Sequence, residues 1–207
     1  MELSSVCSEC AAQLPRLDGP RCTVCQEPLD DPTLDLCRAC GTRDRGFSLA
    51  RALGPYTSGW GDLIRALKFE RERAVARFLS AALAAYVKQE NPFGDVDLIT
   101  YVPMSCADRR ARGFNQAALL AHGLGRRIGI PVVRLLAKVR QTRPQAELTA
   151  AERRKNLRGA FSVVRSGEGT VLIVDDILTT GATVEECARA LKAGGYGPVF
   201  VLAVARA

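Results

Sequence analysis

Apolar residues recur at steps of three and four between residues 63 and 86, which is the spacing of an amphipathic helix. A charged break at 70–73 interrupts this pattern and predicts two helical segments rather than one. The same period predicts helices at about 115–128 and 183–193. All of these helices lie after Phe47, where a regular pattern begins.

Short apolar runs of strand length separate the predicted helices. They occupy 97–102, 132–136, 171–174 and 199–204, and Pro103 closes the first of them. Near-continuous runs of valine, isoleucine and leucine that alternate with helices are typical of a parallel sheet buried on both faces. The sequence therefore predicts an α/β fold, with a parallel sheet, helices on both of its faces and no internal repeats.

The first 45 residues have a different composition. They are short of large apolar residues, rich in proline, glycine and aspartate, and contain six of the eight cysteines. These six form three Cys-x-x-Cys pairs: Cys7 and Cys10, Cys22 and Cys25, and Cys37 and Cys40. A two-residue spacer lets both sulfurs face one point, and two pairs complete the tetrahedron of thiolates that Zn(II) prefers. Because so short a segment has little core, the metal would supply much of its stability.

We expect two domains, a zinc-binding module at 1–45 and a larger domain at 46–207. One zinc ion uses four of the six cysteines, and the last two pairs are the preferred set because a glycine follows Cys40, as in a tight knuckle end. The gap between successive pairs is 11 residues in both cases, so spacing does not exclude Cys7 and Cys10 as ligands. Redox exchange through the pairs is the alternative.

The most informative segment is the strand at 171–174 with the residues that follow it. The chain continues with two carboxylates, a loop of threonine and glycine, and the start of a helix: Asp175, Asp176, Ile177, Leu178, Thr179, Thr180, Gly181, Ala182 and Thr183. In an open parallel sheet, ligands lie beyond the carboxyl ends of the strands. Gly181 permits a positive φ, and the loop amides at the start of a helix form a concave anion site to which the threonine hydroxyls add donors. The segment therefore predicts a phosphate-binding loop.

The two acids distinguish this loop from other phosphate loops. Successive side chains of a regular strand point to opposite faces, so Asp175 and Asp176 act together only if the chain bends at the strand end. Ionised carboxylates accept hydrogen bonds and suit a ribose 2′,3′-diol, directly or through Mg(II). Neither a nucleotide P-loop nor a dinucleotide glycine motif is present. The alternative is that Thr183 and Glu186 only cap the helix, which leaves the acids and the Thr-Thr-Gly run unexplained.

Composition and charge limit the class of protein. The chain has 207 residues, 47% of them apolar, and a formal charge of +7, which excludes a wholly disordered chain. No apolar stretch approaches the ~20 residues of a membrane-spanning helix and no export signal precedes the cysteines, so we expect a cytoplasmic protein without a membrane span. Thirteen of the 29 Lys and Arg residues but only three of the 22 acids lie at 101–160. This local excess predicts a surface for a diphosphate, a nucleic-acid backbone, or both.

The segment at 171–183 resembles the signature of type I phosphoribosyltransferases, which bind 5-phosphoribosyl-1-pyrophosphate (PRPP). Two basic segments narrow the resemblance to the ComF family of competence-associated proteins. The first, 109–116, ends in Gly-Phe-Asn-Gln, and the second, 143–161, contains the matching residues Gln145, Arg153, Asn156, Gly159 and Phe161. The cysteine pairs and Leu67-Lys68-Phe69 match as well, so the resemblance covers nearly the whole chain.

The resemblance implies a fold of the type I phosphoribosyltransferase kind and roles for the site residues. It assigns Asp175 and Asp176 to the ribose hydroxyls, and Thr179 to Thr183 to the 5′-phosphate. It also implies that the turn after Val102 approaches the pyrophosphate, with three arginines as counter-charges: Arg109, Arg110 and Arg112. The implied cofactors are a structural Zn(II) and Mg(II) bound with PRPP.

Two functions are compatible with the resemblance. The first is a ComF-type factor of DNA uptake and natural transformation, with PRPP or a related sugar phosphate as ligand, and single-stranded DNA and a DNA-uptake helicase as partners; transfer of a phosphoribosyl group is compatible with this role. The second is a phosphoribosyltransferase of nucleotide salvage or metabolism without a DNA role, in which Mg(II) and arginines stabilise the departing pyrophosphate. The residues identify no acceptor for the transferred group.

Overall fold

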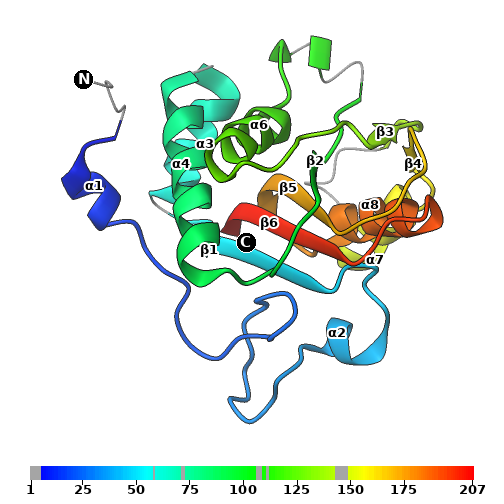
Figure 1. Ribbon diagram of the computed structural model, residues 1–207. Helices are drawn as coiled ribbons and strands as arrows, with labels where there is room; N and C mark the ends of the chain where they lie inside the picture. Colours follow the sequence, from blue (N-terminus) through cyan, green and yellow to red (C-terminus); the bar gives the residue numbers. More distant parts are fainter. Residues whose placement is uncertain (1–5, 58, 71–72, 106–108, 111, 143–148) are drawn as a thin grey trace.

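The computed structural model describes residues 6–57, 59–70, 73–105, 109–110, 112–142 and 149–207. Its centre is a four-stranded sheet in the order β1-β6-β5-β2 (Figure 1). The strands are β1 (Leu49–Pro55), β2 (Leu98–Tyr101), β5 (Val171–Leu178) and β6 (Val199–Arg206). All neighbouring pairs in this sheet run parallel, which confirms the expected sheet type.

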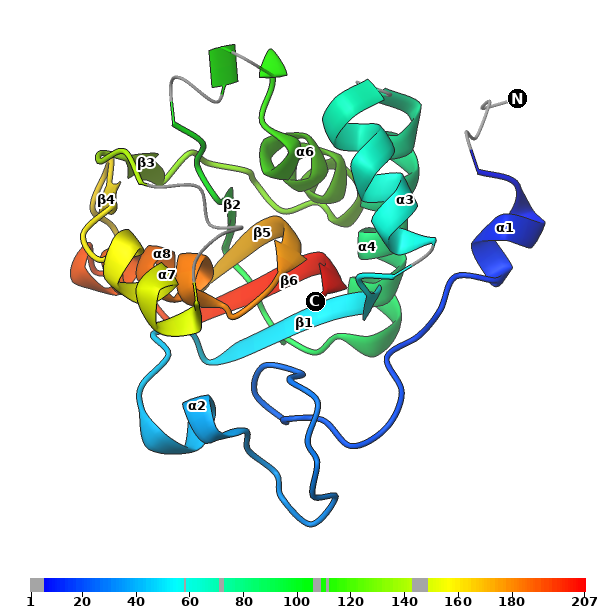
Figure 2. The same cartoon turned by 180° about the vertical axis from the view of Figure 1, so that it is seen from behind.

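Helices cover both faces of the sheet (Figures 1 and 2). One face packs against α3 (Trp60–Arg65), the π-helical turn η1 (Ala66–Glu70), α4 (Arg73–Glu90) and α6 (Gln116–Ile128). The other face packs against α7 (Ala150–Leu157), α8 (Ala182–Ala193) and a small antiparallel sheet of β3 (Leu136–Lys138) and β4 (Phe161–Val163). The N-terminal segment contains two short helices, α1 (Ser8–Ala12) and α2 (Arg38–Thr42). Of the described helices, none has the length and apolar character needed to cross a membrane.

The core has two halves because side chains alternate along β5. Val171 and Ile173 belong to the cluster on the α8 face, whereas Leu172 and Val174 belong to the cluster beneath α4 and α6. All four side chains are fully buried. A strand with apolar residues at every position is what a sheet covered on both faces requires.

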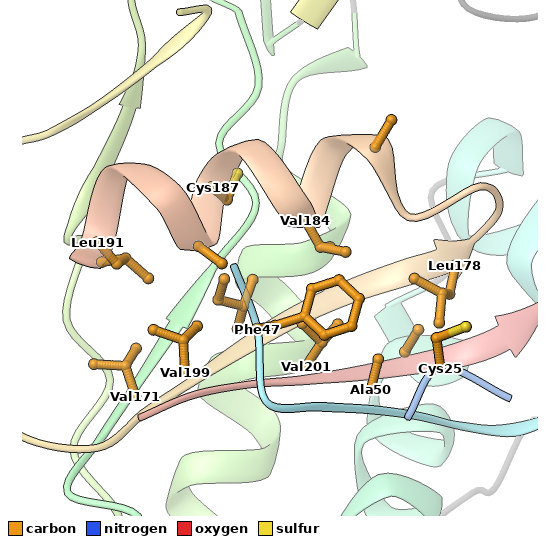
Figure 3. Packing of buried hydrophobic residues seen from close by; sticks show 14 of the residues in the cluster. Cys25, Phe47, Ala50, Val171, Leu178, Val184, Cys187, Leu191, Val199 and Val201 are labelled. Atoms are coloured by element: carbon orange, nitrogen blue, oxygen red, sulfur yellow. The ribbon is translucent and has the colours of Figure 1, made fainter. Parts of the chain in front are cut away.

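The cysteine-rich segment packs on the same face as α8. The cluster that contains Val184 and Leu191 of α8 also contains Phe47, Ala50 and Cys25 (Figure 3). Cys25 is 2% exposed, and Phe47 is 4% exposed. The residues around the cysteines therefore share a core with the sheet.

One predicted strand is partly wrong. At 132–136 the sequence predicts a strand of the sheet, but Val132 makes only an isolated parallel bridge to Ile99 at the sheet edge. The chain then leaves the sheet, and Leu136 begins β3, which pairs with β4 instead. The bridge consists of two hydrogen bonds, from Ile99 N to Pro131 O at 2.9 Å and from Val133 N to Ile99 O at 2.8 Å.

β1 is absent from the sequence-based prediction, for a reason visible in its packing. Its buried positions are Ala50, Ala52 and Gly54, which alternate with half-buried residues. Because the residues at the buried positions are small, the sequence shows almost no alternation of large apolar and polar residues there. Gly54 is required because a Cβ there would collide with Trp60 and with the carbonyl of Pro15, which accepts a hydrogen bond from Trp60 Nε1 at 2.8 Å.

Candidate functional site

The acid pair lies within β5 and not at its end. The neighbouring strand β2 stops at Tyr101, which pairs with Val174, whereas β5 continues through Asp175 and Asp176 to Leu178. The bend expected at the acids is therefore wrong. Both acids nevertheless line one pocket of about 130 Å³, because the chain after β2 turns away and leaves this edge of β5 open.

The pocket places cations beside the acids. Lys68 Nζ lies 2.6 Å from Asp176 Oδ2, and the two side chains are 19% and 14% exposed. Of the three arginines implied as counter-charges, Arg112 lines the pocket, whereas Arg109 and Arg110 are exposed and are not among its described lining residues. Lys68 comes from the π-helical turn η1, so sequence reasoning did not distinguish it from a surface lysine.

The pKa of Asp175 is raised well above its ordinary value. Burial is the main cause, and the neighbouring carboxylate of Asp176 adds to it, while Lys68 acts in the opposite direction. Two carboxylates in one pocket are easier to ionise when a cation or several hydroxyl donors face them. The arrangement suits a polyhydroxylated or metal-bound ligand.

The start of α6 adds a donor for which the described part of the chain offers no acceptor. Asn115 is the N-cap, since its Oδ1 accepts from Ala118 N at 3.1 Å while its Nδ2 donates to Val102 O at 3.0 Å. Gln116 follows it, lines the pocket and is 4% exposed. Its Nε2 group has no hydrogen-bond partner among the described residues. A buried amide donor without an acceptor lowers the stability of the fold by about 1–3 kcal/mol, and a ligand oxygen that accepts from it would remove this cost.

The loop after β5 has the backbone expected of an anion site. Gly181 has a φ of 76° and is the N-cap residue of α8, without a side-chain cap. The alternative in which Thr183 and Glu186 form a capping box is wrong, because the helix begins at Ala182 and the Glu186 carboxylate accepts from Gly159 N at 2.7 Å. Thr179 and Thr180 are half-buried.

Two buried arginines hold the carbonyls of this loop. Arg206 donates to Leu178 O at 2.8 Å and also to Thr179 O, and Arg45 donates to Thr180 O at 2.8 Å. In a trans peptide unit the N–H points opposite to the C=O. The N–H groups that follow these three carbonyls therefore point away from the arginines, which leaves a set of donors on the other side of the loop.

Four cysteines form a metal-binding arrangement. The sulfurs of Cys22, Cys25, Cys37 and Cys40 all lie within 4.8 Å of one another, and Cys25 Sγ is 3.6 Å from Cys37 Sγ. A tetrahedral Zn(II) with Zn–S bonds of about 2.3 Å requires sulfurs about 3.8 Å apart, so the residues fit this ion. The cluster contains the last two pairs, as preferred from the sequence, whereas Cys7 and Cys10 are exposed at α1 and do not join it.

Backbone donors surround these sulfurs. Burial opposes ionisation of Cys22, but N–H groups of Cys37, Cys25 and Val24 outweigh it and lower the pKa of Cys22 to about 7. Burial raises the pKa of Cys25 to about 12, and burial also raises that of Cys40. A bound cation would favour the thiolate forms of Cys25 and Cys40 against this effect of burial.

Part of the second basic segment lies outside the described residues. Gln145, which the family resemblance singles out, is among residues 143–148, which the structure does not describe. Within the described part, α7 begins at a capping box in which Thr149 N donates to Glu152 Oε2 at 2.8 Å. Arg153 lies on this helix, and Gly159 follows it.

The parallel sheet, with an acid pair on one strand and a Thr-Gly loop at its carboxyl end, agrees with the fold that the resemblance to type I phosphoribosyltransferases implies. The DNA utilization protein YhgH of Salmonella typhi is 31% identical over 97% of this chain and 90% of its own length. Competence protein F of Haemophilus influenzae is 30% identical over 99% and 91%. Competence protein ComFC of Bacillus subtilis is 27% identical over 92% and 79%. The chain belongs to the ComF family.

Other comparisons add less. No protein-family model matches the chain. Glutamine PRPP amidotransferase of B. subtilis, solved in complex with ADP and GMP, aligns with 62% of this chain and 26% of its own, at 25% identity and a TM-score of 0.43. Adenine phosphoribosyltransferase of Leishmania tarentolae aligns with 68% of this chain and 74% of its own, at 11% identity and a TM-score of 0.42.

Proposed function

We propose that the acid pocket and the loop after β5 together bind PRPP with Mg(II), and that the protein is a ComF-family factor of DNA uptake. The observation that carries the proposal is the juxtaposition of two carboxylates with a buried donor, Gln116 Nε2, that has no acceptor among the described residues. Thr179 lies three residues after Asp176, about 10 Å along an extended strand. That span suits one sugar phosphate held at both ends.

Each group then has a chemical role. Asp175 and Asp176 accept from the ribose 2′- and 3′-hydroxyls, directly or through Mg(II). The loop N–H groups hold the 5′-phosphate at the positive end of α8. Arg112 and Lys68 face the diphosphate, for which Lys68 shares or gives up its ion pair with Asp176.

Zinc is the metal we propose for the four cysteines. Its preferred thiolate tetrahedron agrees with the sulfur cluster, and the surrounding segment has few large apolar residues of its own. Elemental analysis should give about one zinc per chain. A chain with none, when purified without chelator, would contradict the assignment.

The DNA role has a structural candidate of its own, next to the acid pocket. A hollow of about 560 Å³ between α4 and α6 is lined by Arg77, Arg112 and Arg126, with Phe114 among its apolar residues. No ion pair between Arg77 or Arg126 and another described residue is present. Guanidinium groups beside an aromatic ring suit the phosphates and bases of a single strand. The names of the relatives point to the same class of partner.

Calorimetric titration with PRPP and Mg(II) tests the ligand assignment. Asp176→Asn should weaken binding by ~1–3 kcal/mol, the usual value of a charge-assisted contact. Asp95→Asn is the control, because Asp95 is an exposed acid outside the pocket. Equal affinity of both variants and the unchanged protein would refute the assignment. Release of pyrophosphate in the same samples would indicate a transferase, and binding without release would indicate a ligand-binding factor.

Salt-dependent binding of a single-stranded oligonucleotide tests the DNA role. Replacing Arg77 and Arg126 by serine should lower affinity and reduce the slope of log K against log salt by about 0.7 per lost phosphate contact. The control replaces Arg16 and Lys88, two exposed cations outside the hollow. If both double variants bind like the unchanged protein, the hollow is not the DNA site.

A further inference from the structure

Two buried arginines connect the cysteine-rich segment to the phosphate loop. Arg45 is 4% exposed and Arg206 is 5% exposed, which is unusual for arginine. Each touches the N-terminal segment with one part of its guanidinium group and loop carbonyls with another. No sequence motif relates them to the loop.

Arg45 joins three parts of the molecule. Its Nη1 donates to Cys40 Sγ at 3.6 Å, its Nη2 to Thr180 O at 2.8 Å, and its Nε to Glu185 Oε2 of α8 at 2.9 Å. The guanidinium carbon also lies 5.1 Å from the centre of the Phe47 ring. Each of its three nitrogens therefore donates to a partner, and one of these partners is a proposed metal ligand.

Arg206 makes the second connection. It forms an ion pair with Glu27, which lies between the two cysteine pairs of the cluster, and donates to Leu178 O and Thr179 O. The carbonyls of three successive residues before Gly181 thus point toward the two arginines. The N–H groups between them point toward the site of the 5′-phosphate.

The loop is shaped to accept Arg45. A Cβ at Gly181 would collide with Nη2 of Arg45. Glycine is therefore required at this position for two reasons. It adopts a positive φ, and it leaves room for the guanidinium group of Arg45.

We propose that metal occupancy of the four-cysteine site sets the phosphate affinity of the loop, with Arg45 as the positioning residue and Arg206 as its second support. A bound metal fixes Cys40 Sγ, and four thiolates around a divalent ion carry net negative charge that holds the guanidinium in place. Without the metal, Arg45 loses one of its anchors and the loop carbonyls turn more freely. A ligand must then reorder the N–H groups as it binds, which weakens its affinity.

The inference rests on the proposed ligand, so its test uses two readouts. Calorimetry with ribose 5-phosphate, and with PRPP and Mg(II), compares metal-loaded and chelated protein. We expect affinity to fall about tenfold on metal removal, a usual size for coupling between sites. Arg45→Gln should have low affinity for the ligand both with and without metal. Arg45→Lys should recover part of the affinity, because lysine keeps the positive charge but lacks the several N–H donors of the guanidinium group.

Arg51→Gln is the matched control. Arg51 is half-buried and donates to Thr23 O at 2.9 Å and to Val24 O in the same N-terminal segment, with no contact to the loop among the described residues. It should retain the metal dependence of the unchanged protein. Equal affinity with and without metal, or metal dependence that persists in Arg45→Gln, would overturn the inference.

Hydrogen exchange separates this inference from the proposed function. In metal-loaded Arg45→Gln the amides at 179–182 should exchange faster than in the unchanged protein, while those of Leu172 to Val174 should not change. If the unchanged protein binds neither sugar phosphate, the PRPP proposal fails, but faster exchange of the loop would still support the arginine connection. Unchanged exchange in the loop would refute it whether or not a ligand binds.

Discussion

The cysteine-rich segment and the parallel sheet are stabilised by different forces. In the sheet, Leu172 and Val201 are fully buried among aliphatic neighbours, and apolar burial supplies the free energy. In the segment around the cysteines, Leu34 and Leu36 are 53% and 39% exposed, so large apolar residues are not its core. Its buried side chains include those of Cys22, Cys25 and Cys37, and Glu27, whose side chain is 47% exposed, forms an ion pair with the buried Arg206. From this contrast we expect the cysteine-rich segment to depend on a bound metal for its stability and the sheet to be independent of it.

The largest expected effect is the response of the cysteine-rich segment to metal loss. Cys37→Ser should abolish metal binding, whose free energy is on the order of 10 kcal/mol in small zinc modules and is coupled to folding. Elemental analysis and hydrogen exchange at 21–45 measure the two changes. Cys7→Ser makes the same chemical change outside the cluster and should alter neither. Zinc loss in Cys7→Ser would show that the ligand set differs from the cluster.

A cavity in the sheet should cost less and be independent of the metal. Leu172→Ala removes a fully buried side chain, and we expect a loss of ~2–5 kcal/mol in the free energy of unfolding, because the transfer and cavity costs add. Urea unfolding with and without chelator measures it. Leu34→Ala is the control, since this leucine is exposed. A loss in Leu34→Ala as large as in Leu172→Ala would refute the contrast between the two regions.

The acid pair should lower stability as the pH rises. The pKa of Asp175 is raised in the folded protein, so the native state holds this proton more tightly than the unfolded chain does. Its contribution is therefore fully present below the ordinary aspartate value near 4 and is lost as the pH rises through the folded pKa. Asp175→Asn should melt a few degrees higher at pH 8, with a smaller difference at pH 4. A melting difference that does not change with pH would count against this picture.

The smallest expected effect concerns Gln116. Gln116→Met removes a buried donor that has no acceptor among the described residues, so stability should change by about 1 kcal/mol or less, or improve slightly. PRPP affinity should nevertheless fall. Thermal melting and calorimetry on the same variant separate the two results. Marked destabilisation with unchanged affinity would mean that the amide has a structural role in place of a ligand-binding one.

Sequence reasoning performed well where a physical pattern is local. The strands at 171–174 and 199–204 and the helix at 183–193 were predicted because apolar runs and helical periods extend over neighbouring residues. It failed at β1, where small residues such as Ala50 occupy the buried positions. At 132–136 it misjudged the pairing partner, because an apolar run does not reveal which strand will accept it.

In the candidate site, too, local features of the sequence were predictable and long-range contacts were not. The sequence predicted that Asp175 and Asp176 act together through a bend of the chain, whereas the open edge beyond Tyr101 brings them to one pocket. It did not identify Arg45, whose contact with Thr180 spans 135 residues along the chain. Long-range contacts of this kind leave no periodic signal.

The amino-acid sequence alone determined the chemistry that is available: cysteine pairs that can ligate a metal, two adjacent acids, and a loop whose glycine can adopt a positive φ. These properties belong to residues and their near neighbours. Long-range packing establishes which four cysteines meet, that Lys68 faces Asp176, and that two arginines contact the loop carbonyls. These contacts join residues that are far apart in the sequence. They form because distant segments pack around a common core, and the order of residues along the chain does not specify that packing.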